Sequence, residues 1–487
     1  MSGIRAAAFW SMGAQYLVFV IQFAVSVVIA RFFLAPAEVG LFGIALAAAM
    51  LVSVLQDFGL TRYIGAQAEL DEATIRSCSS VALLFGAGVA LLILLLSPVF
   101  REVYGEPRLV PLLAIVAASY LLVPFGIVPF ALLQRGMQFR PLAFVTVGAA
   151  FANAAVAVGL AALGYSAFAL AWGLVADKAV RAAGSMMAAG RGPAWPPRFG
   201  AAGSILRFGS AASILYVSGA LGTRSPELIV GRLLGFAAVG LYGRAASLAA
   251  QLVTLVAGAV GAVFTPAFRQ IRDSGGAMGP AYVRVVAGYT ALTWPALAFL
   301  AAASTPLVLI LYGEAWRGVA PLLAFIALAE MAFTALPLHM EIPVLMGRMR
   351  RLLALNLLDT AASIGLLAVG AGIGLTEAAG SRLLYGLVWL LIYGGFMRRL
   401  TGFSWGAMLS VHGRSALLAI ATILPLLGLY ERVPPDRIGL ALLVGAAMAG
   451  ALLWLAGLFV LRHPMRAEVL HVTAMLLARR RGQTEAI

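Results

Sequence analysis

Leu228–Gly243 reads LIVGRLLGFAAVGLYG, and Val28–Gly43 reads VIARFFLAPAEVGLFG. Both stretches contain an arginine and an apolar turn, followed by Val-Gly-Leu, an aromatic residue and Gly. Further matches occur in the same order at a near-constant offset, which indicates an internal repeat. They are Tyr104-Gly105-Glu106 with Tyr312-Gly313-Glu314, and Gly173-Leu174-Val175 with Gly386-Leu387-Val388. The chain is therefore predicted to contain two related halves.

The composition places the whole chain in a membrane. Of 487 residues, 62% are hydrophobic and 11% are charged, and the mean hydropathy is +0.99. No water-soluble domain could present such a surface to solvent. Apolar windows of roughly 20 residues, the length that crosses the hydrocarbon core, are predicted at residues 7–30, 39–61, 77–100, 109–133, 142–163, 166–188, 205–231, 237–267, 281–311, 320–346, 352–373, 378–397, 411–430 and 438–461.

The expected fold is an all-α polytopic membrane protein with fourteen transmembrane helices, arranged as two parallel six-helix repeats plus two C-terminal helices. An even number of spans in each half makes both halves enter the membrane in the same direction, so a cleft between them is the default substrate path. The expected parts are an N-terminal six-helix lobe at 1–190, a linker at 191–204, a C-terminal six-helix lobe at 205–400, two extra helices at 401–461 and a basic tail at 462–487.

Basic residues predict the orientation. With the N-terminus in the cytoplasm, 24 of the 34 Lys and Arg residues lie in inner loops, inner span ends or the tail, as the positive-inside rule requires. Both termini and the linker should then be cytoplasmic. The net charge of +15 is explained by anionic membrane lipids as partners, and no nucleic acid is needed. The single cysteine, Cys78, excludes an internal disulfide.

Polar residues follow one face of two predicted helices. Facing lipid they would be unfavourable, so a cavity or a neighbouring helix is expected beside them; packing between helices is the alternative for each residue. The two sets are Ser11, Gln15, Gln22 and Ser26 in the first span, and Ser213, Tyr216, Thr223 and Glu227 in the seventh.

Acidic residues occur within several spans. Glu330 lies ten residues inside Ala320, roughly 15 Å deep, where it must be paired, protonated or hydrated. Pro337 and Pro343 follow it and predict broken helix. Asp359 shares one face of the next span with neighbouring polar residues. Asp57, near the end of the second span, is either a cavity residue or an interfacial cap or ion pair with Arg62. In the sixth span, Asp177 and Arg181 are predicted to form a structural ion pair.

Motifs for several other chemistries are absent from the sequence. The four histidines show no metal-ligand spacing, and no GxxxxGK[ST] loop for ATP occurs. The predicted outer loops are short and contain no paired-acid motif. We therefore expect a transporter rather than an enzyme, with no cofactor and no metal.

Motifs along about residues 5–400 resemble the oligosaccharide flippase (polysaccharide transporter) family, whose superfamily also holds multidrug and toxin extrusion exporters and lipid II flippases. They are Ala30-Arg31 to Gly43, Asp57-Phe58-Gly59-Leu60, Leu132-Leu133-Gln134-Arg135 with Phe139-Arg140, Arg207-Phe208-Gly209, Ile229 to Gly235 with Val239-Gly240-Leu241-Tyr242, and Tyr312-Gly313-Glu314-Ala315-Trp316. One departure is Arg224-Ser225-Pro226-Glu227, where relatives are expected to carry an asparagine and an aspartate.

The resemblance implies a protein of the bacterial inner membrane that turns an undecaprenyl-diphosphate-linked oligosaccharide from the inner to the outer leaflet by alternating access. Polysaccharide polymerase and export proteins are the expected protein partners. A basic, hydrated cleft could replace the hydration of the diphosphate while the polyprenyl tail stays in lipid. The residues expected to contact the anion are Arg224 and Arg244, then Arg31, Arg62 and Arg232.

Alternatives stay open for individual residues and for the function. Arg31 and Arg232 are also explained by snorkelling at the outer membrane edge. Glu330, Asp359, Glu227 and Asp57 are candidates for proton or cation coupling, with buried pairing as the alternative. The rival functions are a lipid II flippase, a cation-coupled multidrug exporter and, from another class, a membrane glycan polymerase or ligase.

Overall fold

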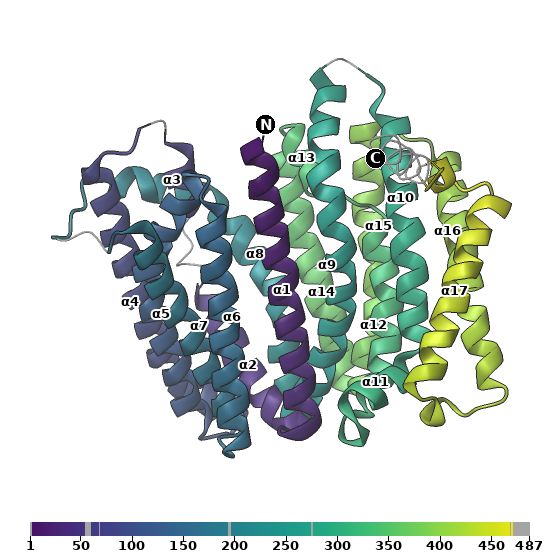
Figure 1. Cartoon of the computed structure of the whole chain (residues 1–487), viewed down its shortest axis with the longest axis horizontal. Helices are drawn as coiled ribbons and strands as arrows, with labels where there is room; N and C mark the ends of the chain where they lie inside the picture. The colour runs from purple at the N-terminus through teal and green to yellow at the C-terminus, as the bar shows by residue number, and fades with distance from the viewer. Residues whose placement is uncertain are drawn as a thin grey trace, which may run out of the picture. The chain divides into compact units, whose positions relative to one another are not determined.

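The computed structural model describes residues 2–53, 60–67, 69–192, 196–273, 276–467 and 469–470. These residues form helices and connecting turns without any strand (Figure 1). The α-helices are α1 (Ser2–Phe32), α2 (Pro36–Ser53), α3 (Leu60–Ala66), α4 (Glu72–Tyr104), α5 (Leu109–Arg135), α6 (Phe139–Ala162), α7 (Ala167–Ala189), α8 (Ala202–Leu234), α9 (Phe236–Asp273), α10 (Met278–Ala302), α11 (Ser304–Tyr312), α12 (Val319–Thr334), α13 (Glu341–Leu345), α14 (Met349–Ile373), α15 (Leu375–Thr401), α16 (Trp405–Tyr430) and α17 (Leu440–Val460).

The helical membrane fold that the sequence predicts is confirmed. Within the described ranges, 11 helices are long and apolar enough to cross a membrane. The other three predicted windows contain α7, α8 and α12. In the described ranges these three helices are not among those long and apolar enough to cross a membrane. The chain is thus a multi-pass membrane protein, and the count of fourteen spans stays a prediction.

The chain divides into two compact units, Met1–Leu241 and Tyr242–Ile487. Helix α8 packs against α2, α3 and α4 and belongs to the first unit. The boundary between the two compact units therefore lies within α9, whereas the boundary between the predicted lobes lies at residues 191–204. The lobe boundaries describe the sequence repeat and stay a prediction.

In the first unit, α7 packs between α5 and α6, while α4 packs on α5 and α1 packs on α6. Small residues allow these close approaches, as they commonly do between membrane helices. A Cβ atom at Gly126 of α5 would lie 2.9 Å from Ala182 Cα of α7, and one at Gly173 of α7 would lie 2.9 Å from Ala157 Cβ of α6. The three helices therefore form a tight bundle in which α7 is central.

The N-terminal ends of three helices in this unit are joined through one carboxylate, Glu38 in the first turn of α2. Arg108, just before α5, donates to Glu38 Oε1 at 3.0 Å, and Ser166, just before α7, donates to Glu38 Oε2. Arg108 also donates to Glu106 at 3.1 Å. This hydrogen bond lowers the pKa of the Glu106 carboxyl below its usual value.

The segment before α8 contacts α4, and the first turn of α8 contacts α3. Ser80 Oγ accepts from the Arg198 backbone N–H at 2.9 Å, and the hydroxyls of Tyr63 and Ser204 lie 3.0 Å apart. The described part of the predicted linker thus lies on the first unit. Pro193, in the same linker, lies outside the described residues.

The two copies of the repeated motif meet within the first unit. A Cβ atom at Gly40 in α2 would overlap the carbonyl oxygen of Phe236, and one at Gly240 in α9 would overlap the carbonyl oxygen of Pro36. The glycine of each Val-Gly-Leu motif therefore packs directly on the backbone that begins the other motif's helix. The absence of a side chain at both positions is what permits this reciprocal contact.

In the second unit, α10 packs against α12 and α16, α15 packs against α12 and α14, and α17 packs on α16. The predicted break after Glu330 is confirmed. Helix α12 ends at Thr334 and α13 begins at Glu341, and Tyr282 Oη donates to the Pro337 carbonyl between them at 3.0 Å. A tyrosine from α10 thus satisfies one backbone group that the break leaves without a helical partner.

The two C-terminal helices are attached to α10 through buried polar contacts. Trp454 Nε1 donates to the Ala291 carbonyl at 2.8 Å. Ser415 Oγ lies 2.8 Å from Thr290 Oγ1 and 3.2 Å from His463 Nε2. All three residues of this second group are fully buried.

Candidate substrate and ion sites

Arg224 and Glu227 lie one turn apart on α8, close to its C-terminal end. Arg224 Nη1 and Glu227 Oε1 are 3.5 Å apart, and both side chains are partly buried. The Tyr104 hydroxyl donates to the Leu228 carbonyl at 3.0 Å, which holds this part of α8 against α4. The predicted anion contact Arg224 is therefore oriented by Glu227 through one nitrogen, and a guanidinium has further N–H groups that can donate to an anion.

Three other predicted anion contacts lie on the surface of the first unit. Arg31 is exposed in the last turn of α1, Arg62 is exposed in α3, and Arg232 is exposed in the last turn of α8. These helix-end positions of Arg31 and Arg232 agree with the snorkelling alternative. Their predicted contact with substrate stays a prediction. Asp57 lies outside the described residues.

Most side chains of the predicted polar face of α1 are exposed. Ser11, Gln15 and Gln22 are exposed and Ser26 is partly buried, and α1 packs mainly against α6 within the first unit. On α8, the Thr223 hydroxyl donates to the Gly219 carbonyl at 2.9 Å.

For Ser213 and Tyr216, the side chains lie outside the part of the chain that is described. Whether either polar face lines a cavity stays a prediction.

Arg244 of α9 is oriented by aromatic rings. Its guanidinium carbon lies 5.2 Å from the ring centroid of Tyr312 and 5.2 Å from that of Trp316. Such cation–π contacts stabilise a buried guanidinium. The rings come from the Tyr312-Gly313-Glu314-Ala315-Trp316 motif of the family resemblance, whose first three residues also belong to the repeat. Both aromatic residues of the motif therefore contact Arg244 within the second unit.

Glu330 is paired with a basic residue. Arg382 of α15 donates from Nη2 to Glu330 Oε1 at 2.8 Å, and its guanidinium carbon lies 5.5 Å from the Phe333 ring centroid. Of the three states that the sequence allowed for Glu330, the structure contains the paired one. Arg382 itself was not predicted, although an arginine well inside an apolar helix is a signal that an acidic partner lies nearby.

Asp359 lies beside this pair and has a different partner. The Tyr385 hydroxyl, one turn after Arg382 on α15, donates to Asp359 Oδ1 at 2.9 Å. Both Asp359 and Asn356 are buried on α14. Because a tyrosine hydroxyl is neutral, this contact does not compensate the charge of Asp359, and within the described ranges Asp359 has no ion pair like that of Glu330.

Aromatic side chains extend this polar cluster toward the break between α12 and α13. The His339 ring centroid lies 4.8 Å from that of Trp389 and 5.2 Å from that of Tyr393. Within the described ranges, no group of three or more His, Cys, Asp or Glu residues could hold a metal ion. The cluster therefore contains separated acids, each with its own partner.

The family of the chain follows from its sequence. Residues 28–321 match the family described as "Polysaccharide biosynthesis protein", which is more than half of the chain. The chain belongs to this family. No curated protein matches it.

Several solved structures with a similar fold are described as flippases or transporters. The structure described as "Lipid II flippase MurJ, inward closed conformation" has a TM-score of 0.72 at 12% identity and covers 95% of this chain and 100% of its own. An inward-facing multidrug resistance MATE family transporter of the MOP superfamily has a TM-score of 0.58 at 16% identity, covering 80% and 96%. A MOP superfamily transporter from Pyrococcus furiosus has a TM-score of 0.52 at 15% identity, covering 82% and 94%. The chain therefore shares its fold with these proteins.

Proposed function

We propose that the protein is a flippase that turns undecaprenyl-diphosphate-linked oligosaccharide from the inner to the outer leaflet of the bacterial inner membrane, with both termini in the cytoplasm. Its product would feed the export of a surface polysaccharide such as O-antigen, capsule or exopolysaccharide. The observation that carries this proposal is membership of a polysaccharide biosynthesis family together with a transporter fold.

The charges within the helices support a substrate that carries phosphate. Arg224 is partly buried and shares a long contact with Glu227, and Arg244 is held by two rings. Arginine hydrogen-bonds phosphate in a fork geometry and keeps its charge when desolvated. Both residues therefore suit the transient contact with a diphosphate that crosses the apolar region.

The test replaces both arginines in the native host. Arg224→Ala with Arg244→Ala should abolish surface polysaccharide at normal protein abundance, because each lost charge-assisted contact is worth about 1.5–3 kcal/mol and two together weaken binding by roughly 100-fold or more. Arg317→Ala, which removes an arginine from the exposed pair with Glu314, is the control and should export normally. Unchanged export by the double variant would remove both residues from the substrate path.

A lipid II flippase is the second candidate, because the fold match to one of these proteins covers nearly all of both chains. The two candidates differ in what the cell loses. Depletion that stops surface polysaccharide but leaves cell-wall synthesis intact supports the proposal, whereas lysis and rescue of a strain depleted of its own lipid II flippase would support the second candidate.

A further inference from the structure

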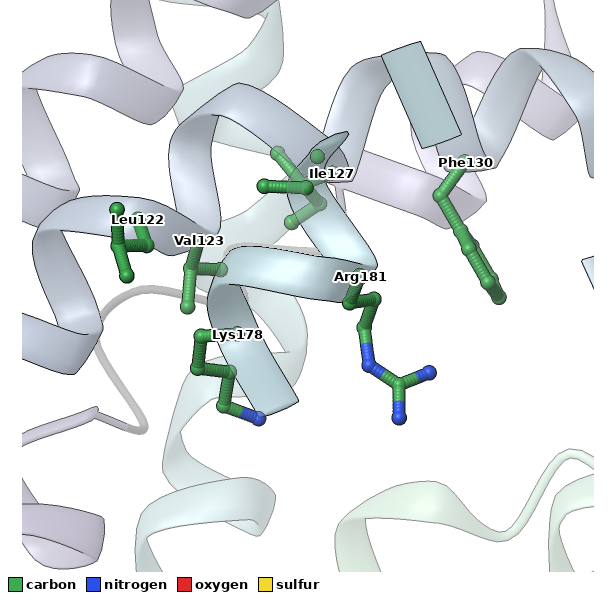
Figure 2. Close-up of a pocket in the computed structure, with 8 residues that line it drawn as sticks. Leu122, Val123, Ile127, Phe130, Lys178 and Arg181 are labelled. Atoms are coloured by element: carbon green, nitrogen blue, oxygen red, sulfur yellow. The ribbon is translucent and has the colours of Figure 1, made fainter. Parts of the chain in front are cut away.

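A groove with a charged wall lies between α5 and α7 in the first unit. It has a volume of ≈180 Å³ and is lined by Leu122, Val123, Gly126, Ile127, Phe130, Lys178, Arg181 and Ala182. Figure 2 shows the Lys178 ammonium and the Arg181 guanidinium extending from α7 beside the apolar side chains of α5. Two other grooves in the described ranges, on α4 and between α1 and α6, have linings without a charged residue.

Lys178, Arg181 and the neighbouring Asp177 form a cluster with more positive than negative charge. Lys178 Nζ lies 3.4 Å from Asp177 Oδ2, and Arg181 Nη2 lies 3.2 Å from Asp177 Oδ1. The ion pair predicted between Asp177 and Arg181 is thus confirmed, but one carboxylate is shared by two cations and the cluster has a net charge of +1. A net charge within a membrane helix is unfavourable unless water or a counter-ion reaches it.

The depth of the cluster favours an anion in transit over a resident lipid. Lys178 lies 11 residues from each end of α7 (Ala167–Ala189), which is about 16 Å along the helix. If α7 spans the membrane as predicted, that position is close to the middle of a core of roughly 30 Å. Phosphates of resident phospholipids lie at the membrane surface, whereas a lipid that is turned over carries its phosphates past this depth.

We propose that the α5/α7 groove is a binding station for the diphosphate of the lipid-linked substrate, which Lys178 and Arg181 hold while the first isoprene units lie against Leu122, Val123, Ile127 and Phe130. This inference rests on the proposed function and adds two cations to the residues expected to contact substrate. Asp177 pairs with both cations and competes with the diphosphate for them. Its charge therefore sets how tightly the anion is held.

The experiment measures binding of radiolabelled geranylgeranyl diphosphate to the full chain in phosphatidylcholine nanodiscs. Lys178→Gln with Arg181→Gln should weaken binding by about 10-fold or more, because two charge-assisted contacts are lost. Asp177→Asn should tighten binding several-fold, a gain that impaired folding could not produce. Arg191→Gln removes an exposed cation that pairs with Glu72 at 2.6 Å, and it should bind like the wild type.

Competitors identify what the groove recognises. Unlabelled geranylgeraniol, which lacks the diphosphate, should not displace the probe. Phosphatidylglycerol that displaces the probe as well as geranylgeranyl diphosphate would indicate a general phospholipid site and overturn the proposal. Equal binding by wild type and the double glutamine variant would overturn it as well.

Deletion of the protein distinguishes failure of the proposed function from failure of the groove proposal. If probe binding depends on Lys178 and Arg181 but deletion of the protein leaves surface polysaccharide unchanged, the groove stands and the proposed function falls. If deletion abolishes surface polysaccharide while the double glutamine variant binds and exports normally, the proposed function stands and the groove falls.

Discussion

Two acids in the second unit, Glu330 and Asp359, differ in the charge of their partners. Glu330 is matched by the arginine Arg382 at 2.8 Å, and Asp359 by the hydroxyl of Tyr385 at 2.9 Å. The Glu330–Arg382 pair is partly buried, and removing one member would leave the other charge without its partner, which is destabilising. Glu330 is therefore suited to a structural role, and Asp359 is the better of the two candidates for binding a coupling proton or cation.

The first prediction compares these two acids. Asp359→Asn should change the pH dependence or cation dependence of substrate transport in proteoliposomes, because it removes an acid whose hydrogen-bond partner, the Tyr385 hydroxyl, is neutral. Glu330→Gln should instead lower the melting temperature of the purified protein and leave the shape of the transport profile unchanged. Identical profiles for wild type and Asp359→Asn would assign Asp359 to structure, and a changed profile for Glu330→Gln would transfer the coupling role to that residue.

His463, just after α17, is held as a neutral ring by its hydrogen bonds. The Met465 N–H donates to His463 Nδ1 at 3.2 Å, so Nδ1 carries no proton and Nε2–H donates to Ser415 Oγ. Ser415 then donates to Thr290 Oγ1, which donates to the Val286 carbonyl at 2.8 Å. Burial and the charge of nearby Arg414 lower the pKa of His463 to about 4.

The second prediction follows from this pKa. Between about pH 6.5 and 4 the unfolded chain binds a proton at this histidine and the folded chain does not, so stability falls as the pH falls through this range. Thermal unfolding in detergent, measured from pH 7.5 to 4.5, should show this loss. His463→Gln should be less stable at pH 7.5 and show a shallower pH dependence, and an unchanged dependence would exclude His463 as its source.

Among the helices, the reciprocal contact of α2 and α9 depends on two glycines. Gly40 and Gly240 each pack on the backbone at the start of the other helix, where a Cβ would overlap a carbonyl oxygen. Backbone cannot move aside as the end of a flexible side chain can. The contact therefore tolerates no side chain without separation of the two helices.

The third prediction concerns this helix contact. Gly40→Ala should lower the melting temperature, by an amount equivalent to about 1–3 kcal/mol for an overpacked site. Gly243→Ala, three residues beyond Gly240 on α9, is the matched control, because a Cβ there meets nothing within 4 Å. The control should be neutral or slightly stabilising, since alanine favours helix over glycine by about 1 kcal/mol. Equal stability of the Gly40 variant and the control would show that α2 and α9 separate without cost.

For the whole molecule, the distribution of basic residues predicts which side of the membrane each loop occupies. The turn between α5 and α6 contains exposed Gln138, and the turn between α6 and α7 contains Leu163, which is 74% exposed. The native Cys78 is fully buried, so single introduced cysteines can report accessibility. The positive-inside rule places the first turn in the cytoplasm and the second outside.

The fourth prediction is a labelling experiment in intact cells with Cys78→Ser as background. Leu163→Cys should react with a membrane-impermeant maleimide, and Gln138→Cys should react only after the cells are opened. The reverse pattern would invert the orientation and place the basic loops outside. Reaction of both residues in intact cells would show that α6 does not cross the membrane.

The sequence alone predicts that the chain is helical, approximately where the helices lie, and that part of the chain is repeated. These features can be predicted because the length of an apolar stretch and the order of motifs are properties of neighbouring residues. The membrane class, the break after Glu330 and the pairing of Asp177 with Arg181 are confirmed for this reason. The family resemblance is confirmed as well, since its motifs lie in the same order along the chain.

Partners far apart in the chain could not be predicted in this way. Arg382 pairs with Glu330 across 52 residues, because α15 packs on α12. His463 reaches Ser415 across 48 residues, because α17, which His463 follows, packs on α16. The sequence marks Glu330 as unfavourable at its depth and marks the Val-Gly-Leu motif as repeated. Tertiary packing decides which side chain compensates the charge of Glu330, and it brings the two motif glycines face to face. Both outcomes depend on the rotation and register of packed helices, which hydropathy does not encode.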